Sequence, residues 1–248
     1  MNTCFSPDLP TVCVRGLGFA DTDEEGLRSY LLHRLNDAAA HTVIFTPNAK
    51  IGADVMQDPE LLSLFQQADL LLPDGAGVLL ASRRHADRPL CHRLPGIEAG
   101  EMILALAAEQ DLPVYFLGGK EGVAQAASER WRSRLPSLTV AGTHHGYFDP
   151  QGVQNDSILE DIRSSGAAVV LVCLGCPAQE RWIVQNRAAL PRVRLFIGLG
   201  GSFDVWAGRL RRAPRIFRTL RCEWLWRMLR EPRRFAQIPA MLRYVFGR

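Results

Sequence analysis

The sequence predicts an α/β protein with a Rossmann-like, mainly parallel sheet flanked by helices, followed by a basic helical appendage at the C-terminus. Three observations support this prediction. Apolar runs alternate with helix-like stretches, several of these runs lack an alternating polar pattern, and arginine is concentrated after residue 208. Strands buried on both faces are near-continuous apolar runs, and strands that alternate with helices are typical of a parallel sheet.

The expected elements follow one another along the chain. We expect strands at 41–45, 70–72, 114–117, 138–141, 167–173 and 193–197. We expect helices at 23–38, 59–67, 97–110, 122–135, 153–164 and 178–188. These elements place a Rossmann-like core at residues 1–208 and the appendage at residues 209–248.

Composition excludes several classes of protein. The 248 residues are 47% hydrophobic and 22% charged, as in an ordinary globular protein. No apolar run reaches the ~18 residues of a membrane-spanning helix, and the N-terminus does not resemble a secretory signal. Six cysteines are too sparse for a disulfide framework. We therefore expect a protein of the reducing cytosol.

The appendage has a charge of its own. Residues 209–248 hold 12 arginines and two glutamates, which leaves 17 basic and 24 acidic residues in the rest of the chain. Apolar residues recur at helical spacing between Pro214 and Pro232, and again after Pro232, where Pro239 is expected as an interruption. A basic amphipathic helix pair with aromatic residues is typical of a helix that lies on an anionic membrane. The alternative is that the apolar stripe packs on the core and the arginines are solvated.

Polar and glycine residues follow the predicted strands, where ligands bind in doubly wound sheets. Asp74 follows strand 70–72 in an apolar setting and is a candidate general base, with a plain Asp-Gly turn as the alternative. Thr46 and Asn48 follow strand 41–45, where they either bind sugar hydroxyls or form a turn.

Glycines follow two further strands. Gly118 and Gly119 precede a helix and are suited to cradle phosphate oxygens, although the sequence there is neither a Walker A loop nor a complete dinucleotide fingerprint. Gly200 and Gly201 suit the close approach of a diphosphate, and Asp204 beyond them is a ligand-binding residue or a helix cap. Gln179 begins a helix after strand 167–173 and is placed to donate to a ligand.

Metal binding is not expected. Cys173 and Cys176 have C-x-x-C spacing but no second pair to complete a zinc site, so packing is the favoured interpretation. His144 and His145 are adjacent, and neighbouring side chains on a regular element point in different directions.

Taken in order, these segments resemble the WecG/TagA/CpsF family of bacterial glycosyltransferases over roughly residues 41–235. The first matching motifs are Thr46-Pro47-Asn48, Leu72-Pro73-Asp74-Gly75-Ala76-Gly77, Arg93 with Gly96, Phe116-Leu117-Gly118-Gly119 with Gly122, and Gly142-x-His144-His145-Gly146-Tyr147-Phe148. The later ones are Leu174 to Ile183 with Asn186-Arg187, Gly198 to Asp204 with Gly208, Arg212-Ala213-Pro214, Glu223-Trp224-Leu225 with Arg227, and Glu231-Pro232-Arg233-Arg234.

The resemblance implies a function. Members transfer a sugar from a UDP-sugar to a polyprenyl-diphosphate-linked saccharide of a cell-surface polysaccharide, with inversion and without a D-x-D metal motif. It implies no cofactor, and it places the protein in the cytoplasm, peripheral on the inner face of the bacterial cell membrane. N-acetylmannosamine, its uronic acid, glucose and glucuronate remain alternatives for the sugar, and a homo-oligomer is left open.

The resemblance also assigns residues. Asp74 matches the proposed general base and Thr46 a substrate contact, while Asn48, Arg93, Gly118, Gly119, Gln179, Gly200, Gly201 and Asp204 are expected to bind substrate. Arg227, Arg233 and Arg234 match appendage residues that contact the lipid diphosphate. The chain departs from the family pattern at Glu98, Cys173, Cys176 and Arg221-Cys222.

The sequence offers less support for three other classes of protein. A Rossmann oxidoreductase would need the complete dinucleotide fingerprint. A non-catalytic membrane-surface scaffold explains the appendage but not the polar residues at the strand ends. Nucleic-acid binding is not expected, because the acidic body offers no broad basic groove.

Overall fold

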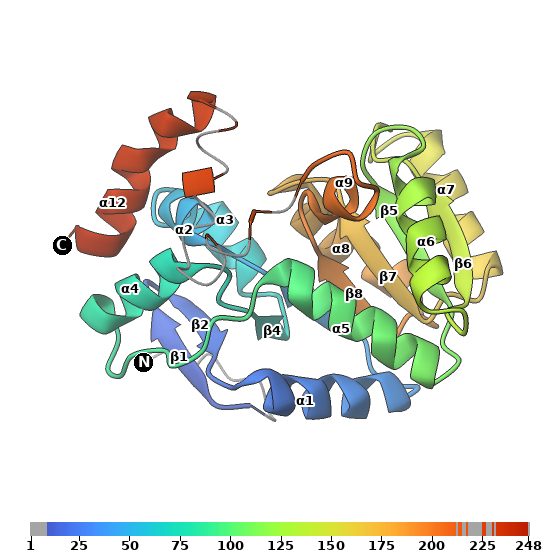
Figure 1. The fold of residues 1–248 in the computed structure, drawn as a ribbon, viewed down its shortest axis with the longest axis horizontal. Helices are drawn as coiled ribbons and strands as arrows, with labels where there is room; N and C mark the ends of the chain where they lie inside the picture. The colour runs from blue at the N-terminus through green and yellow to red at the C-terminus, as the bar shows by residue number, and fades with distance from the viewer. Residues whose placement is uncertain are drawn as a thin grey trace. The chain divides into compact units, whose positions relative to one another are not determined.

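The computed structural model describes residues 9–211, 213–214, 217, 225–226, 230 and 232–247, with only the backbone of residues 232–234. The chain forms two compact units (Figure 1). Unit 1 comprises residues 1–26, 46–95 and 211–248, and unit 2 comprises residues 27–45 and 96–210. The predicted division at residue 208 stays a prediction.

Eight strands form a mostly parallel sheet flanked by helices, which confirms the predicted α/β class. Unit 1 contributes β1 (Thr11–Val14), β2 (Leu17–Ala20) and β4 (Leu70–Leu71), in the order β1-β2-β4. The β1-β2 hairpin is antiparallel, and its two turn residues, Arg15 and Gly16, have φ angles of 54° and 84°. Two positive φ angles are what a tight hairpin turn requires. This hairpin was not among the predicted strands.

The α-helices described in unit 1 are short, with seven to ten residues each. They are α2 (Ala49–Val55), α3 (Pro59–Phe65), α4 (Ala76–His85) and α12 (Ile238–Phe246), with a 3-10 helix η2 (Pro232–Gln237) before α12. Asp58 caps α3 by accepting hydrogen bonds from the N–H groups of Glu60 and Leu61, and Pro59 occupies the first turn. Helix α3 was predicted, whereas α2 and α4 were not.

The C-terminal helix α12 packs against α2 and α4 within unit 1 (Figure 1). Tyr244 is fully buried in this contact, and Gly52 on α2 provides the space for its ring. Pro239 lies in the first turn of α12, so it marks the start of the helix rather than the predicted interruption. The helix predicted after Pro214 falls mostly outside the described residues.

Unit 2 contributes five parallel strands, in the order β3-β8-β7-β5-β6. They are β3 (Thr42–Phe45), β5 (Val114–Gly118), β6 (Val140–His144), β7 (Val169–Cys173) and β8 (Leu195–Gly198). All residues of β3, β5, β7 and β8 are buried, while those of the edge strand β6 are half-buried. All five strands were predicted, several of them as continuous apolar runs, and β6 runs three residues beyond its predicted end.

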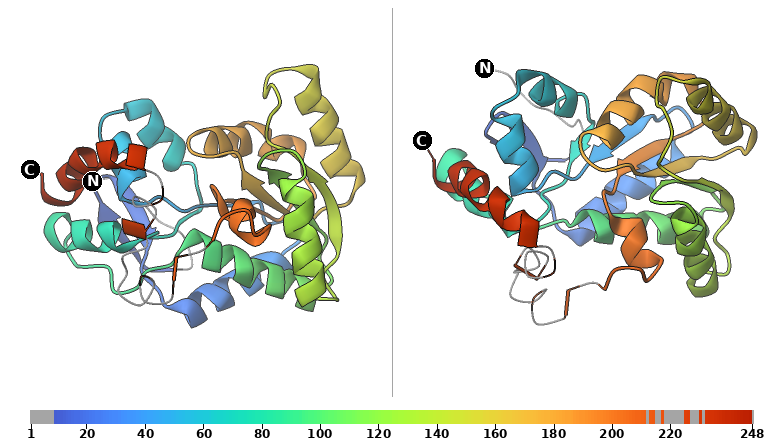
Figure 2. Two further views of the ribbon diagram at one scale, coloured as in Figure 1. Left: turned by 45° about the horizontal axis from the view of Figure 1, so that its top comes forward. Right: turned by 90° about the horizontal axis from the view of Figure 1, so that it is seen from above.

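The helices of unit 2 cover both faces of its strands. They are α1 (Glu24–Asn36), α5 (Gly96–Glu109), α6 (Val123–Arg134), α7 (Val153–Ser164), α8 (Ala178–Asn186), the 3-10 helix η1 (Arg187–Ala189) and α9 (Ser202–Trp206). Right-handed crossovers require α6 to lie on the face opposite α7 and α8, as Figure 2 shows. All except α9 were predicted, and α7 has the predicted bounds. Among the described residues, no helix has both the length and the apolar character needed to cross a bilayer.

Candidate active site

In unit 1, two backbone hydrogen bonds draw three of the predicted site segments together. The N–H of Asp74 donates to the carbonyl of Pro47 at 3.4 Å, and the N–H of Leu94 donates to the carbonyl of Pro73 at 3.1 Å. The segments carrying Thr46 and Asn48, Asp74, and Arg93 therefore meet after strands β3 and β4. The strand-end rule predicted the first two segments, and the loop before α5 supplies the third.

Asp74 lies in the loop between the end of β4 at Leu71 and the start of α4 at Ala76. It is half-buried, and Gly75 follows it with φ 97° and no heavy atom within 4 Å of a Cβ built there. Only glycine adopts this backbone readily, so Gly75 makes the turn that starts α4 at Ala76. Asp74 thus sits on a defined turn two residues before a helix, as a carboxylate suited to proton transfer.

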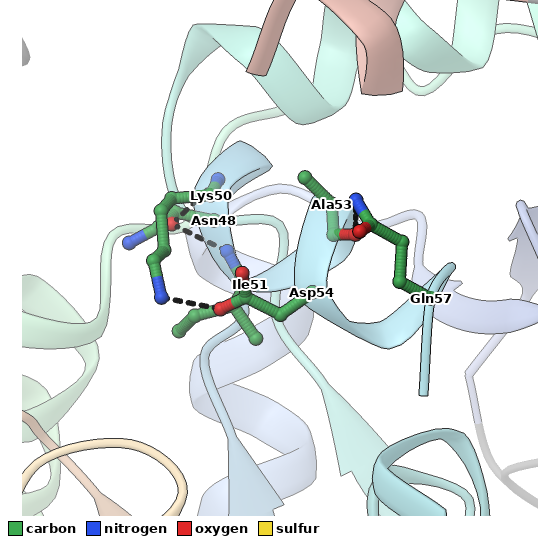
Figure 3. Close-up of polar contacts among 6 residues, drawn as sticks. All are labelled: Asn48, Lys50, Ile51, Ala53, Asp54 and Gln57. Carbon is green, nitrogen blue, oxygen red and sulfur yellow. Dashed lines mark hydrogen bonds and ion pairs between the residues drawn. The ribbon is translucent and has the colours of Figure 1, made fainter. Parts of the chain in front are cut away.

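Asn48 caps helix α2 (Figure 3). Its side-chain oxygen accepts hydrogen bonds from the N–H groups of Lys50, at 3.0 Å, and Ile51, at 3.2 Å. Lys50 in turn pairs with Asp54 one turn along the helix. Because an amide oxygen has two lone pairs, capping occupies it and leaves the Nδ2 group as the part of Asn48 suited to a substrate. Thr46, just before Asn48, is buried.

In unit 2, the first glycine segment lies at the end of β5. The backbone of Gly118 passes so close to Cys173 on β7 that a Cβ at Gly118 would lie 2.3 Å from the Cys173 carbonyl oxygen. The N–H of Gly119 donates to that same oxygen at 3.0 Å, and the carbonyl of Gly119 accepts from the N–H of Gly146 at 2.8 Å. A Cβ at Gly119 would lie 2.8 Å from the Val123 side chain, and one at Gly146 would lie 2.7 Å from the Leu174 side chain, so all three glycines have no room for a side chain.

The second glycine segment follows β8 and leads into α9. Gly200 has φ 57°, and its N–H donates to the side-chain oxygen of Gln179 at 2.9 Å. Gln179, the second residue of α8, is only 3% exposed, so its side chain supports the glycine loop from the protein interior. Gly201 is the residue before α9, and Asp204 is the third residue of that helix. The interpretation of Asp204 as a helix cap is therefore wrong.

A buried carboxyl group that sequence reasoning did not single out lies beside Gln179. Glu180 is 1% exposed, and its Oε1 accepts a hydrogen bond from Gln179 Nε2 at 2.8 Å. Desolvation raises the pKa of Glu180 to about 7, against hydrogen bonds from Gln179 and Cys176 that lower it. A neutral and a charged Glu180 are therefore both populated near neutral pH.

Cys173 and the paired histidines have local structural partners. The Cys173 sulfur accepts hydrogen bonds from the first N–H groups of α9, and burial raises the pKa of its thiol well above the ordinary value. The ring centroids of His144 and His145 lie 4.4 Å apart at the end of β6. The two rings are therefore neighbours, although side chains adjacent in sequence were expected to point in different directions. The Nδ1 atoms of both rings contact nearby backbone groups. Within the described residues, no group of three or more His, Cys, Asp or Glu side chains could hold a metal ion.

The side chains of the three predicted appendage arginines lie outside the described part of the chain. Arg227 lies outside the described residues, and only the backbone of Arg233 and Arg234, in η2, is described. A further arginine that the sequence did not single out, Arg209, donates from its guanidinium to the carbonyl of Glu121 at 3.3 Å. This contact places a cation at the loop before α6, within unit 2.

The fold is that of an α/β protein, and within each unit the candidate site residues lie at or near the carboxyl ends of parallel strands. Residues 12–247 match the Glycosyl transferase WecG/TagA/CpsF family. The chain belongs to this glycosyltransferase family, as its motifs indicated. It is similar to the N-acetylglucosaminyldiphosphoundecaprenol N-acetyl-beta-D-mannosaminyltransferase of Bacillus spizizenii, with 32% identity over 237 residues that cover 96% of this chain and 90% of the relative.

Proposed function

We propose that this chain transfers N-acetylmannosamine from its UDP derivative to an N-acetylglucosaminyl-diphosphate-polyprenol. The observation that supports this choice is the near full-length similarity to the Bacillus spizizenii enzyme, whose name gives both the sugar transferred and the lipid-linked acceptor. Of the four sugars that remained open from the sequence, the relative favours N-acetylmannosamine.

The proposed reaction is a single displacement with inversion. A hydroxyl oxygen of the acceptor attacks the anomeric carbon of the donor, and Asp74 takes the proton of that hydroxyl. The bond from the anomeric carbon to the diphosphate oxygen breaks, and UDP leaves with the electron pair. The location of Asp74 on a fixed turn after β4 supports its role as the base, because a base must be held within reach of its proton.

The neighbouring residues of unit 1 supply substrate contacts in this proposal. Thr46 and Arg93 lie in segments that backbone hydrogen bonds connect to the Asp74 turn. The Nδ2 group of Asn48 donates to a substrate oxygen, since its side-chain oxygen caps α2. Such contacts hold the acceptor hydroxyl and the base in line with the reacting carbon.

The glycine segments of unit 2 receive the donor diphosphate in this proposal. Gly118 and Gly119 precede α6, and Gly200 and Gly201 precede α9 with Asp204. Backbone N–H groups at such turns offset the negative charge that develops on the leaving UDP. Gln179 contributes by fixing the Gly200 N–H, so its role is to shape the loop.

The appendage completes the proposal at the membrane surface. Arg227, Arg233 and Arg234 neutralise the diphosphate of the lipid acceptor, and the concentration of arginine in residues 209–248 supports contact with the anionic inner face of the cell membrane. Arginine guanidinium groups perform the charge neutralisation that Mg²⁺ provides in other transferases. We therefore expect transfer without an added metal ion.

A donor panel tests this function. The purified full-length protein is incubated with N-acetylglucosaminyl-diphosphate-polyprenol and, separately, with UDP-linked N-acetylmannosamine, its uronic acid, glucose and glucuronate. We expect transfer of N-acetylmannosamine alone, unchanged by a chelator, with the inverted anomer seen by NMR of the product. Faster transfer of another sugar would refute the donor assignment. Loss of transfer with chelator, restored by Mg²⁺, would refute metal independence.

A further inference from the structure

A chain of two side-chain hydrogen bonds joins a buried acid to the glycine loop after β8. Glu180 Oε1 accepts from Gln179 Nε2 at 2.8 Å, and Gln179 Oε1 accepts from the N–H of Gly200 at 2.9 Å. The side-chain amide of Gln179 lies against the backbone of Gly198, at the start of the loop: a Cβ built at Gly198 would lie 2.8 Å from Gln179 Nε2. The amide of Gln179 can therefore present its oxygen to Gly200 only while its nitrogen faces Glu180.

The acid itself cannot contact a ligand. Glu180 is 1% exposed, and its Oε2 atom is buried without a hydrogen-bond partner among the described residues. A carboxyl group in such a position costs free energy by desolvation, so its stabilising role in the fold is small or negative. What it does provide is the acceptor that orients the Gln179 amide.

Other hydrogen bonds of the loop lie on either side of Gly200. The N–H of Leu199 donates to the carbonyl of Val172 at 2.8 Å, and the hydroxyl of Ser202 donates to the carbonyl of Leu199 at 2.7 Å. Between these two anchors, Gly200 has φ 57° and no heavy atom within 4 Å of a Cβ built there. Gln179 is thus the side chain that fixes the middle of the loop.

We propose that Glu180 is a positioning residue that acts through Gln179 to hold the Gly200 loop in the shape that receives the donor diphosphate. The proposal rests on the proposed function for the identity of the ligand. The relay itself rests on the hydrogen bonds within unit 2. Its consequence is that the acceptor atom at position 180 matters, whereas its charge does not.

Three variants and a control separate this role from a merely structural one. Glu180→Met keeps the volume of the side chain but removes the acceptor, and Gln179→Met removes the relay itself. Glu180→Gln keeps an oxygen that can accept from Gln179. Trp182→Phe is the control, because it removes a buried hydrogen bond from the same helix, that of Trp182 Nε1 to Asn155, without touching the relay.

The hydrogen-exchange rate of the Gly200 amide in the full-length protein reports on the two hydrogen bonds of the relay and needs no ligand. We expect exchange about tenfold faster in Glu180→Met and Gln179→Met, as for loss of one hydrogen bond, and near wild-type exchange in Glu180→Gln and Trp182→Phe. Unchanged exchange in Glu180→Met, or equally fast exchange in Glu180→Gln, would overturn the proposal.

Calorimetric titration with UDP connects the relay to the donor. We expect a Kd about tenfold higher for Glu180→Met and Gln179→Met, no further increase in the double variant, and a wild-type Kd for Glu180→Gln. If the wild type binds UDP and Glu180→Met binds it equally well, the inference is wrong. If the wild type itself does not bind UDP, the proposed function fails, while the exchange data still decide the relay.

Discussion

The ring of Tyr244 lies directly against the backbone of Gly52: a Cβ built at Gly52 would come within 2.4 Å of Tyr244 Cε2. Helix α12, near the C-terminus, therefore packs against α2 within unit 1. Helix α2 is the helix that Asn48 caps. Arg15 and His85 hold the end of α12 through the carbonyls of Gly247 and Val245. The tail of the chain thus stabilises the same unit that carries Asp74.

Replacing Gly52 tests this contact. Alanine favours a helix over glycine by about 1 kcal/mol, but overpacking against the Tyr244 ring costs about 1–3 kcal/mol, so we expect Gly52→Ala to destabilise the protein by up to about 2 kcal/mol. Urea denaturation measures the change. The double variant Gly52→Ala/Tyr244→Leu should lose less stability than the two single variants together, since leucine frees the space. A gain in stability in Gly52→Ala would show that the helices do not meet in this way.

The buried Glu180 makes stability depend on pH. Its pKa rises from 4.5 to about 7 on folding, so between these values the native state holds a proton that the unfolded chain has released. The free energy of unfolding therefore falls as pH rises from about 4.5 to about 7, by at most about 3 kcal/mol, and levels off above. The difference between wild type and Glu180→Gln across this range isolates the effect. A difference that is flat, or that favours the wild type as pH rises, would contradict it.

A buried amide network orients helix α8. Trp182 Nε1 donates to Asn155 Oδ1 at 2.7 Å, Asn155 Nδ2 donates to Asn186 Oδ1 at 3.1 Å, and Asn186 Nδ2 donates to the Trp182 carbonyl at 2.8 Å. Asn155→Ala leaves two buried groups without partners, so we expect a loss of about 2–4 kcal/mol in urea denaturation. Gln125→Ala, which removes an exposed side-chain bond to Glu129, should change stability by less than about 0.5 kcal/mol. Equal effects of the two variants would refute the importance of the network.

The close contact between β5 and β7 at Gly118 leaves no room for a side chain. Its φ is 134°, and the carbonyl oxygen of Cys173 occupies the place of a Cβ. We expect Gly118→Ala to lower stability by about 3 kcal/mol or more, read from the unfolding midpoint. Gly201→Ala is the matched control, because Gly201 has a negative φ and open space around it. If Gly118→Ala unfolded at the wild-type midpoint, β5 and β7 could not approach as described.

Most of the buried strands and most helices of the fold could be predicted from sequence, whereas α2, α4, α9 and the β1-β2 hairpin could not. Continuous apolar runs identified β5 and β7, because a strand buried on both faces needs no polar residue. Helix α9 has five residues, too few for a periodic pattern, and the glycines at the start of α4 resemble a loop. Helix α2 was missed although α3, which also has seven residues, was predicted. The hairpin β1-β2 was missed because its turn, Arg15-Gly16, is not one of the strong hairpin signals.

The candidate site shows the same division. Asp74 and Gly200 follow strands in the chain and Gly118 ends one, so the strand-end rule selects them as candidates without knowledge of their partners. Glu180 was missed because a glutamate in the first turn of a helix usually faces solvent, and only tertiary packing buries it. Its link to Gly200 spans 20 residues of sequence and depends on the rotamer of Gln179, which no sequence pattern encodes.

The central claim is that this chain transfers a sugar to a lipid-linked acceptor with Asp74 as the base. The most direct measurement compares wild type and Asp74→Asn for entry of labelled N-acetylmannosamine from its UDP derivative into the lipid phase, with UDP binding measured for both. We predict transfer by the wild type, and turnover lower by about 10²–10⁴ in Asp74→Asn with a similar Kd for UDP. Near wild-type turnover in Asp74→Asn, or no transfer by the wild type, would contradict the account.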